Sequence, residues 1–486
     1  MIHLGWFVGR GFSVHGWKQD WWGDDFRDWI SPDIYLDLAR TLDRACFDYV
    51  MIEDGSLIPN AYGGSMDAYL RHAVNAPKAD PMPLVPLMAQ VTKGLGVIAT
   101  MTTAFYPPYL GARLAATNDH LTRGRSGINL VTAHNDRAAQ NFGLDRHYEH
   151  DTRYAMASEW IEVVDKLWRS WEPGAIRADV DAGVYADASK VHEINHEGEF
   201  YRCRGPLNLP PGPQGRPVVC QAGGSQAGRS FAAKHADTII ALVRTVAEAK
   251  SYKADILKKL AELGRAPQSC KIMFCVSVTL GETVGEARER KARRAAACAA
   301  EIEPRLASLS FFGQRDLSKS PLDEPFRPAE TNASRTMVEA YTAKGRTLRE
   351  IAADPDVNGI PFVGTPDSVA AEMIEAMAEI GGDGLLFTEP LSRRSVAEIT
   401  DGLIPALQRR GAVSCDDGAS ASGMVRGCGG QGGHHGSECE RQRGEETVHC
   451  GVDWVGCGDH RLRPRWVAGY FSGEWIGATE CGEALG

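Results

Sequence analysis

The sequence predicts an α/β fold, a (β/α)8 barrel in which parallel strands are surrounded by helices. Two observations predict it. Short apolar runs typical of buried strands alternate with segments whose apolar residues recur at helical spacing, a rhythm that indicates parallel βα units. In addition, the strand-like run 128–131 passes directly into polar residues and a long loop, which is how a barrel builds one wall of its active site.

The first half of the chain supplies the opening βα units. Residues 3–8 are the first expected strand, and the Trp- and Gly-rich segment 9–29 is expected to be a loop over the barrel mouth. Ser31 and Pro32 are typical of an N-cap followed by the first helical position. The other elements expected here are strands at 48–52, 95–103 and 128–131 and a helix at 83–90.

A long helix is expected from about residue 151. Its apolar positions at helical spacing are Ala157, Ile161, Val164 and Trp168. His150 and Tyr154 lie four positions apart at the start of this helix. Because residues four apart share one helix face, their side chains can converge on one ligand.

The second half begins with a long insertion, 172–217, that is rich in Pro and Gly. We expect it to be irregular, and a loop of this size inside a compact domain is usually functional. Residues 282–349 are charged and expected to be mostly helical. Later strands are expected at 217–220, 238–243, 271–279 and 384–388, with helices ending at His235, starting near Pro366 and closing the barrel near Leu407.

Composition and net charge exclude some classes of protein. The chain has 486 residues, 43% of them hydrophobic, and a net charge of -10, which argues against a nucleic-acid binder that neutralises phosphates. No run is long enough to span a bilayer and no signal peptide is recognised, so we expect a cytoplasmic protein without membrane attachment. Six cysteines are expected to be free, mostly buried thiols: Cys46, Cys203, Cys220, Cys270, Cys275 and Cys298.

Two regions are expected, a catalytic domain at 1–412 and a tail at 413–486. The tail is dense in Gly, Cys and Trp and has almost no periodic apolar pattern. It is interpreted as a frameshifted or otherwise non-native extension, as a disordered tail, or as a Cys/His metal appendage. The groups for the last reading are His449, Cys450, Cys457 and His460, but their spacing does not match a paired C-x-x-C zinc pattern, so no metal site is predicted.

Several long motifs in one order make the chain recognisable. They include ARLAATNDHLTRGR, GRSGINLVT, QAGGS and VGTPDSVA, with the H-x-x-x-Y of His150 and Tyr154 among them. Over residues 2–412 the sequence resembles the flavin-dependent monooxygenases related to bacterial luciferase. The group it resembles contains nitrilotriacetate monooxygenase, dibenzothiophene-sulfone monooxygenase, pristinamycin synthase and long-chain alkane monooxygenase. The resemblance implies a bacterial-luciferase-like TIM barrel.

The QAGGS motif is the expected phosphate site. It follows a strand and precedes a helix, so glycine backbone and the free N–H groups of the helix start can approach an anion, although a simple tight turn would look the same. The resemblance assigns Gly223, Gly224 and Ser225 to the phosphate of flavin mononucleotide (FMN). The family usually has two serines after the glycine, and one hydroxyl is absent here. No G-x-G-x-x-G with a matching acidic residue follows the first strand, which favours FMN over FAD or NAD.

The resemblance also assigns flavin contacts to strand ends and to the long helix. The residues are Asp54, Thr100, Asn129, Thr132, His150 and Tyr154. The family usually reads NVVTS where this chain reads NLVTA, so Ala133 replaces the last hydroxyl. Each of the six assigned residues could instead have an ordinary structural role, for example as a loop-capping Asp or a solvated His.

A VHGW segment near the N-terminus resembles the family's H-x-G-W region. The resemblance makes His15 and His150 the candidates for stabilising or protonating a flavin peroxide. Trp17 and Trp21 are expected to give the substrate pocket an aromatic wall, although loop aromatics often only pack.

The function implied is that of a two-component monooxygenase. Reduced FMN (FMNH2) from a separate NAD(P)H:flavin reductase would react with O2 to a C4a-hydroperoxide that oxygenates a small organic substrate, with an apolar or aromatic xenobiotic favoured. A homo-oligomer, dimer or tetramer, is expected. The alternatives are a deazaflavin (coenzyme F420) oxidoreductase on the same barrel and a non-catalytic barrel protein.

Overall fold

The computed structural model describes residues 1–9, 27, 29–326 and 345–415. The chain divides into two compact units, 1–430 and 431–486, and all described residues belong to the first. The predicted boundary after residue 412 stays a prediction.

Eight parallel strands close into a barrel, which confirms the predicted fold class. Each strand pairs with the next in chain order, and the ring is completed by the pairing of the last strand with the first. The strands are β1 (His3–Val8), β2 (Tyr49–Ile52), β3 (Gly96–Thr102), β4 (Ser126–Val131), β9 (Val218–Gln221), β10 (Thr238–Ala241), β11 (Lys271–Leu280) and β13 (Gly384–Phe387). A strand without a sequence prediction, β12 (Ile360–Gly364), pairs with the C-terminal half of β11 outside the ring.

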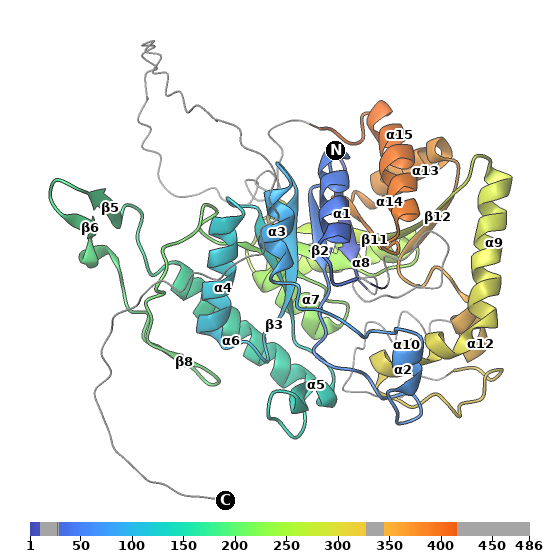
Figure 1. Cartoon of the computed structure of the whole chain (residues 1–486), viewed down its shortest axis with the longest axis horizontal. Coiled ribbons are helices and arrows are strands. Elements are labelled where there is room, and N and C mark those ends of the chain that lie inside the picture. The colour runs from blue at the N-terminus through green and yellow to red at the C-terminus, as the bar shows by residue number, and fades with distance from the viewer. Residues whose placement is uncertain (10–26, 28, 327–344, 416–486) are drawn as a thin grey trace, which may run out of the picture. The chain divides into compact units, whose positions relative to one another are not determined.

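Helices pack around this ring (Figure 1). They include α1 (Asp33–Arg44), α3 (Leu84–Gln90), α4 (Pro108–Leu121), α6 (His150–Trp168), α7 (Gln226–His235), α8 (Val246–Glu262), α13 (Pro366–Ile380) and α15 (Ile404–Arg409). The expected stripe of α6 is fully buried against the barrel. Helix α1 begins one residue later than predicted, with Pro32 as its N-cap, while the Ser31 hydroxyl accepts from the Asp33 amide at 3.4 Å. No helix in the described part of the chain is long and apolar enough to cross a membrane.

A second apolar cluster lies apart from the barrel core and forms a cap. It joins α2 (Asp67–Arg71), α10 (Ile302–Gly313) and α12 (Leu348–Ala353), which lie together in Figure 1. Tyr69, Val74, Phe311 and Phe312 are among its buried side chains. The exposed helix α9 (Val284–Ala300) leads from β11 into this cap. The prediction of a mostly helical segment after β11 is therefore right for its described part.

The insertion at 172–217 is more ordered than predicted. It contains two antiparallel hairpins, β5 (Ile176–Asp179) with β6 (Val184–Ala186) and β7 (His196–Glu197) with β8 (Arg202–Cys203). Strands this short, with mostly exposed or half-buried side chains, leave no apolar alternation in the sequence. The expectation of an irregular segment is corrected accordingly.

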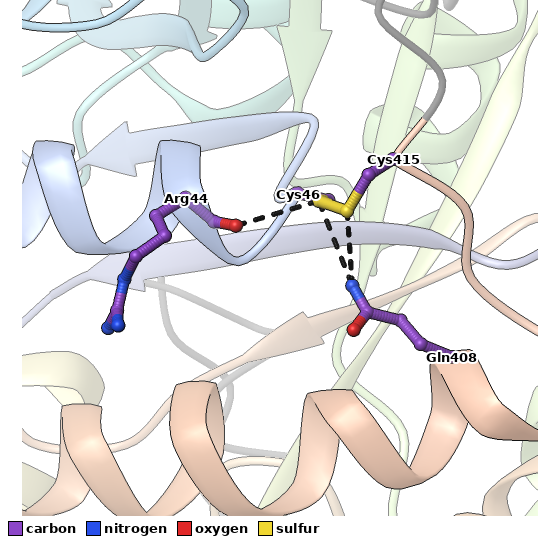
Figure 2. The surroundings of a disulfide bond; sticks show 4 residues. All are labelled: Arg44, Cys46, Gln408 and Cys415. Atoms are coloured by element: carbon purple, nitrogen blue, oxygen red, sulfur yellow. Dashed lines mark hydrogen bonds between the residues drawn. A yellow bond between two sulfur atoms is a disulfide. The ribbon is translucent and has the colours of Figure 1, made fainter.

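One cysteine prediction is wrong. Cys46, expected to be a free thiol, forms a disulfide with Cys415, and Gln408 contacts both sulfur atoms (Figure 2). The bond joins the turn after α1 to the chain that follows α15, a sequence separation of 369 residues. The other five cysteines predicted to be thiols form no disulfide within the described part of the chain; three of them are buried and two half-buried: Cys220, Cys270, Cys275, Cys203 and Cys298.

Candidate active site

A large cavity lies at the C-terminal ends of the barrel strands, between the barrel and the cap. Its volume is about 1150 Å³. Cavities that hold one small molecule usually measure about 300–1,000 Å³, so this one has room for a cofactor and a second molecule. The C-terminal mouth is also where barrel enzymes place their chemistry.

The loop between β9 and α7 forms one end of the cavity. Ser225 caps α7, because its hydroxyl accepts from the Gly228 amide at 3.1 Å. The two glycine carbonyls are held from outside the loop: Tyr252 donates to Gly223 O at 2.6 Å and Arg229 to Gly224 O at 2.8 Å. Ser225 and Gly224 line the cavity, at the N-terminus of a helix where anions bind.

Gly223 has a packing role in this loop and is not among the cavity-lining residues. A Cβ at this position would lie 2.6 Å from the carbonyl of Gly228 in the first turn of α7. The missing side chain therefore lets the loop pack directly onto the helix, and Gly224 and Ser225 are left to face a ligand.

The first turn of α6 reaches the same place. His150 Nε2 lies 3.4 Å from the Ser225 hydroxyl, and its Nδ1 lies 2.7 Å from Asp151. The Tyr154 hydroxyl is within hydrogen-bonding reach of Ser225, and burial raises the pKa of Tyr154, so that it stays a neutral donor. The His150 and Tyr154 rings are 5.1 Å apart. The N-terminal ends of α6 and α7 thus bring three polar side chains together: His150, Tyr154 and Ser225.

Three buried polar side chains continue from this point across neighbouring strands. Thr100, Asn129 and Gln221 are only 3–4% exposed and line the cavity. Asn129 donates to the Thr100 hydroxyl at 3.0 Å. The remaining oxygens, Asn129 Oδ1 and Gln221 Oε1, have no hydrogen-bond partner among the described residues. Buried acceptors left unpaired are costly, so they fit a ligand with N–H or O–H donors, such as the ring and ribityl groups of a flavin.

Asp54 lies just beyond β2 and also lines the cavity. Burial raises its pKa to about 6, against the opposing effects of the Gly55 amide, 2.7 Å away, and the Lys78 ammonium. Lys78 is almost fully buried and forms an ion pair with Glu53 at 3.4 Å. Sequence reasoning assigned no role to Lys78, because nothing local to the sequence shows that this lysine is buried beside Asp54.

The residues after β4 line the cavity as well. Thr132, a predicted flavin contact, is among them, and its carbonyl lies 2.8 Å from His147 Nε2. His134 follows, and its ring lies 5.1 Å from Phe311 of the cap. Burial lowers the pKa of His134 to about 4, so the imidazole is neutral at physiological pH. His134 stands among the polar residues after a strand, a signal that could have marked it as a site residue.

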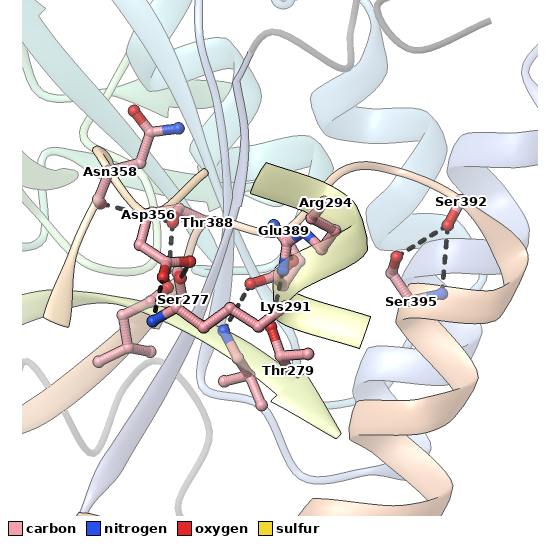
Figure 3. A network of polar contacts seen from close by, with 12 residues as sticks. Ser277, Thr279, Lys291, Arg294, Asp356, Asn358, Thr388, Glu389, Ser392 and Ser395 are labelled. Atoms are coloured by element: carbon pink, nitrogen blue, oxygen red, sulfur yellow. Dashed lines mark hydrogen bonds and ion pairs between the residues drawn. The ribbon is translucent and has the colours of Figure 1, made fainter. Parts of the chain in front are cut away.

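A network of charged and hydroxyl groups forms the wall beside β11 and β13 (Figure 3). Buried Asp356 accepts from the Ser277 hydroxyl at 2.9 Å and pairs with Lys291 of α9 at 2.6 Å. Glu389, also buried, accepts from the Val278 amide at 2.6 Å. Arg294 of α9 lies 3.9 Å from Glu389. Cations of α9 therefore hold this helix to the strand ends.

Three predicted site residues lie outside the described residues. They are His15, a predicted catalytic residue, and Trp17 and Trp21, the predicted aromatic wall. Their roles stay predictions.

Comparison with known proteins places this chain in a family. Residues 7–384 match the family model described as luciferase-like monooxygenase. The chain is 35% identical to dibenzothiophene-sulfone monooxygenase of Rhodococcus erythropolis strain XP, over 84% of this chain and 93% of that protein. It is 35% identical to nitrilotriacetate monooxygenase component A of Aminobacter aminovorans, over 78% and 85% of the two chains.

A solved structure is also similar to this chain. The crystal structure of riboflavin lyase with modified FMN and riboflavin superposes with a TM-score of 0.77 and 30% sequence identity, covering 85% of this chain and 93% of that one. This chain belongs to the luciferase-like monooxygenase family.

Proposed function

We propose that the protein is a two-component monooxygenase that uses reduced FMN, supplied by a separate reductase, to oxygenate a small organic molecule. The observation that carries the proposal is an anion cradle, a group of polar side chains that could bind a phosphate, beside two buried acceptors without a partner among the described residues. Ser225, His150 and Tyr154 form the cradle, and Asn129 and Gln221 supply the acceptors.

Each group has a part in holding FMN. The cradle would bind the phosphate, with the N-terminus of α7 adding favourable electrostatics. Asn129, Gln221 and Thr100 would contact the ring system. Reduced FMN, when bound, supplies the reaction with O2, as flavins do in oxygenases. The work left to the protein is to exclude water and to orient the second molecule in the cavity.

A separate reductase is supported by two observations. The sequence has no dinucleotide fingerprint after its first strand. One relative carries the designation component A, which names it as part of a multi-component enzyme. We propose the same division of work here.

The test is a binding and turnover experiment on the full chain. Fluorescence titrations with FMN, FAD and coenzyme F420 measure cofactor choice, and oxygen incorporation is then followed with NADH, FMN and a purified flavin reductase. We expect FMN to bind most tightly and oxygenation to require both proteins. Binding of F420 without FMN would indicate a deazaflavin oxidoreductase, and binding of no flavin would indicate a non-catalytic barrel.

A further inference from the structure

We propose that the second molecule in the cavity is uncharged, with an apolar or aromatic body and a neutral hydrogen-bonding group held by Asn75 and His134. The proposal rests on the function above, because it assumes that FMN takes the other end of the cavity. Three features of the described residues carry it: an unpaired amide, an unpaired imidazole nitrogen, and cations most of which are paired with carboxylates.

The unpaired amide is Asn75, in the loop between α2 and α3. It lines the cavity and is 5% exposed, yet neither its oxygen nor its nitrogen has a hydrogen-bond partner in the described part of the chain. Its φ is +56°, a conformation that Asn tolerates better than most residues. A buried amide with neither group paired is costly, so a ligand with a hydrogen-bonding group, such as an acceptor for the amide nitrogen, fits this position.

The imidazole belongs to His134. Its Nε2 atom is buried without a partner among the described residues, and its ring packs edge-on against Phe311, 5.1 Å away, and lies 6.1 Å from Phe312. Val74, directly before Asn75, belongs to the same apolar cluster as these two phenylalanines. Asn75 and His134 therefore border one aromatic surface of the cap.

Most of the described cations that line the cavity are paired with carboxylates of the protein. Lys78 pairs with Glu53, and Arg294 with Glu389. Three more form the ion pairs Arg290–Glu398, Arg293–Glu289 and Arg394–Glu398. Arg305 and Arg153 contact neutral groups, the Cys298 thiol and the Tyr148 carbonyl. At each ion-paired cation, an anionic substrate would have to displace the carboxylate partner and lose its own hydration. A neutral substrate meets the unpaired groups without that cost.

The neutral and anionic alternatives can be compared with one matched pair of probes. Diphenyl sulfone is neutral, aromatic and accepts hydrogen bonds, and its para-carboxy derivative differs by one negative charge. Isothermal titration of both into the full chain saturated with oxidised FMN measures affinity without turnover. We expect the neutral sulfone to bind at least about tenfold more tightly, a difference of roughly 1.4 kcal/mol.

Two variants locate the binding. Asn75→Gly keeps a residue that accepts the positive φ, and His134→Phe keeps an aromatic ring against Phe311. Each should weaken the neutral sulfone about tenfold through one lost hydrogen bond and leave FMN affinity unchanged. Asn208→Gly, at an exposed position that is not among the cavity-lining residues, is the matched control.

Four results would overturn the proposal: equal or tighter binding of the anionic probe, failure of both probes to bind, unchanged sulfone affinity in both variants, or a loss of FMN affinity instead. A wild-type chain that does not bind FMN at all would refute the proposed function itself, which is a separate result.

Discussion

His150 Nε2 lies 3.4 Å from the hydroxyl of Ser225, and this contact joins the first residue of α6 to the N-cap of α7. The two residues are 75 positions apart in the chain. Because both stand at helix N-termini, the positive ends of two helix dipoles face the same part of the cavity. A phosphate bound there would receive hydrogen bonds and favourable electrostatics from both helices.

Replacing Ser225 tests the phosphate site. We expect Ser225→Ala to weaken FMN about tenfold or more, because a hydrogen bond to a charged group is lost. Riboflavin, which has no phosphate, should bind the variant as it binds the wild type. Fluorescence titration with both flavins gives the comparison.

The control for that experiment is Ser392→Ala. Ser392 is likewise an N-cap, accepting from the Ser395 amide at 3.2 Å, on the wall beside β13. Either variant should lose about 1 kcal/mol of stability with its cap. Equal losses of FMN affinity in the two variants would refute the phosphate assignment.

Asp54 gives a pH-dependent prediction. Its folded-state pKa is raised from 3.8 to about 6 by burial, so the folded protein keeps the Asp54 proton to higher pH than the unfolded chain does. The stabilising contribution of the protonated carboxyl is present below about pH 4 and is lost as pH rises through about 6.

Asp54→Asn should therefore stabilise the protein at pH 7.5, on the order of 2 kcal/mol, and have little effect at pH 4. Urea unfolding at the two pH values measures this, with Asp181→Asn on the exposed β5–β6 turn as control. A stabilisation that is the same at both pH values would contradict the role of the buried charge.

The ion pair of Lys291 with Asp356 anchors α9 to the strand ends. Lys291→Met should lower the free energy of unfolding by about 1–3 kcal/mol, since Asp356 is buried and would keep only its hydroxyl partner, Ser277. Urea titration measures the loss, and adding Asp356→Asn should recover part of it.

Arg293→Met is the matched control on the same helix. Arg293 and its partner Glu289 are both largely exposed, so this change should cost less than about 1 kcal/mol. A similar loss in both single variants would show that α9 is held by something other than the buried pair.

The disulfide predicts a large effect of one surface cysteine. Cys415→Ser should lower the free energy of unfolding by about 2–4 kcal/mol, because the cross-link restricts the unfolded chain. Urea unfolding of the wild type in a reducing agent should give the same midpoint as the variant. Cys203→Ser, at a half-buried free thiol, serves as control. If the reducing agent leaves the urea midpoint of the wild type unchanged, the disulfide contributes nothing to stability.

Much of the barrel follows from local patterns in the chain. The run 128–131 and the helical stripe that includes Ile161 and Val164 become β4 and the buried face of α6. Such patterns depend only on neighbouring residues, because a strand or helix face must be apolar wherever it meets a core. Motif resemblance added the QAGGS loop, which the structure places beside His150 and Tyr154.

Other features depend on contacts between distant parts of the chain. Strand β12 exists because β11 extends beyond the ring and offers it an edge. The bond between Cys46 and Cys415 needs two chain segments that the closed barrel brings together. Neither leaves a local pattern that the sequence could show.

The sequence by itself determined the parallel βα order, the likeness to flavin monooxygenases and the loop that caps α7. Only the tertiary structure decided which polar groups in the cavity have no partner among the described residues, among them groups of Asn75, His134 and Gln221. The physical reason is that burial and hydrogen-bond pairing are properties of the whole packed cavity, whereas periodicity and capping are written in a few consecutive residues.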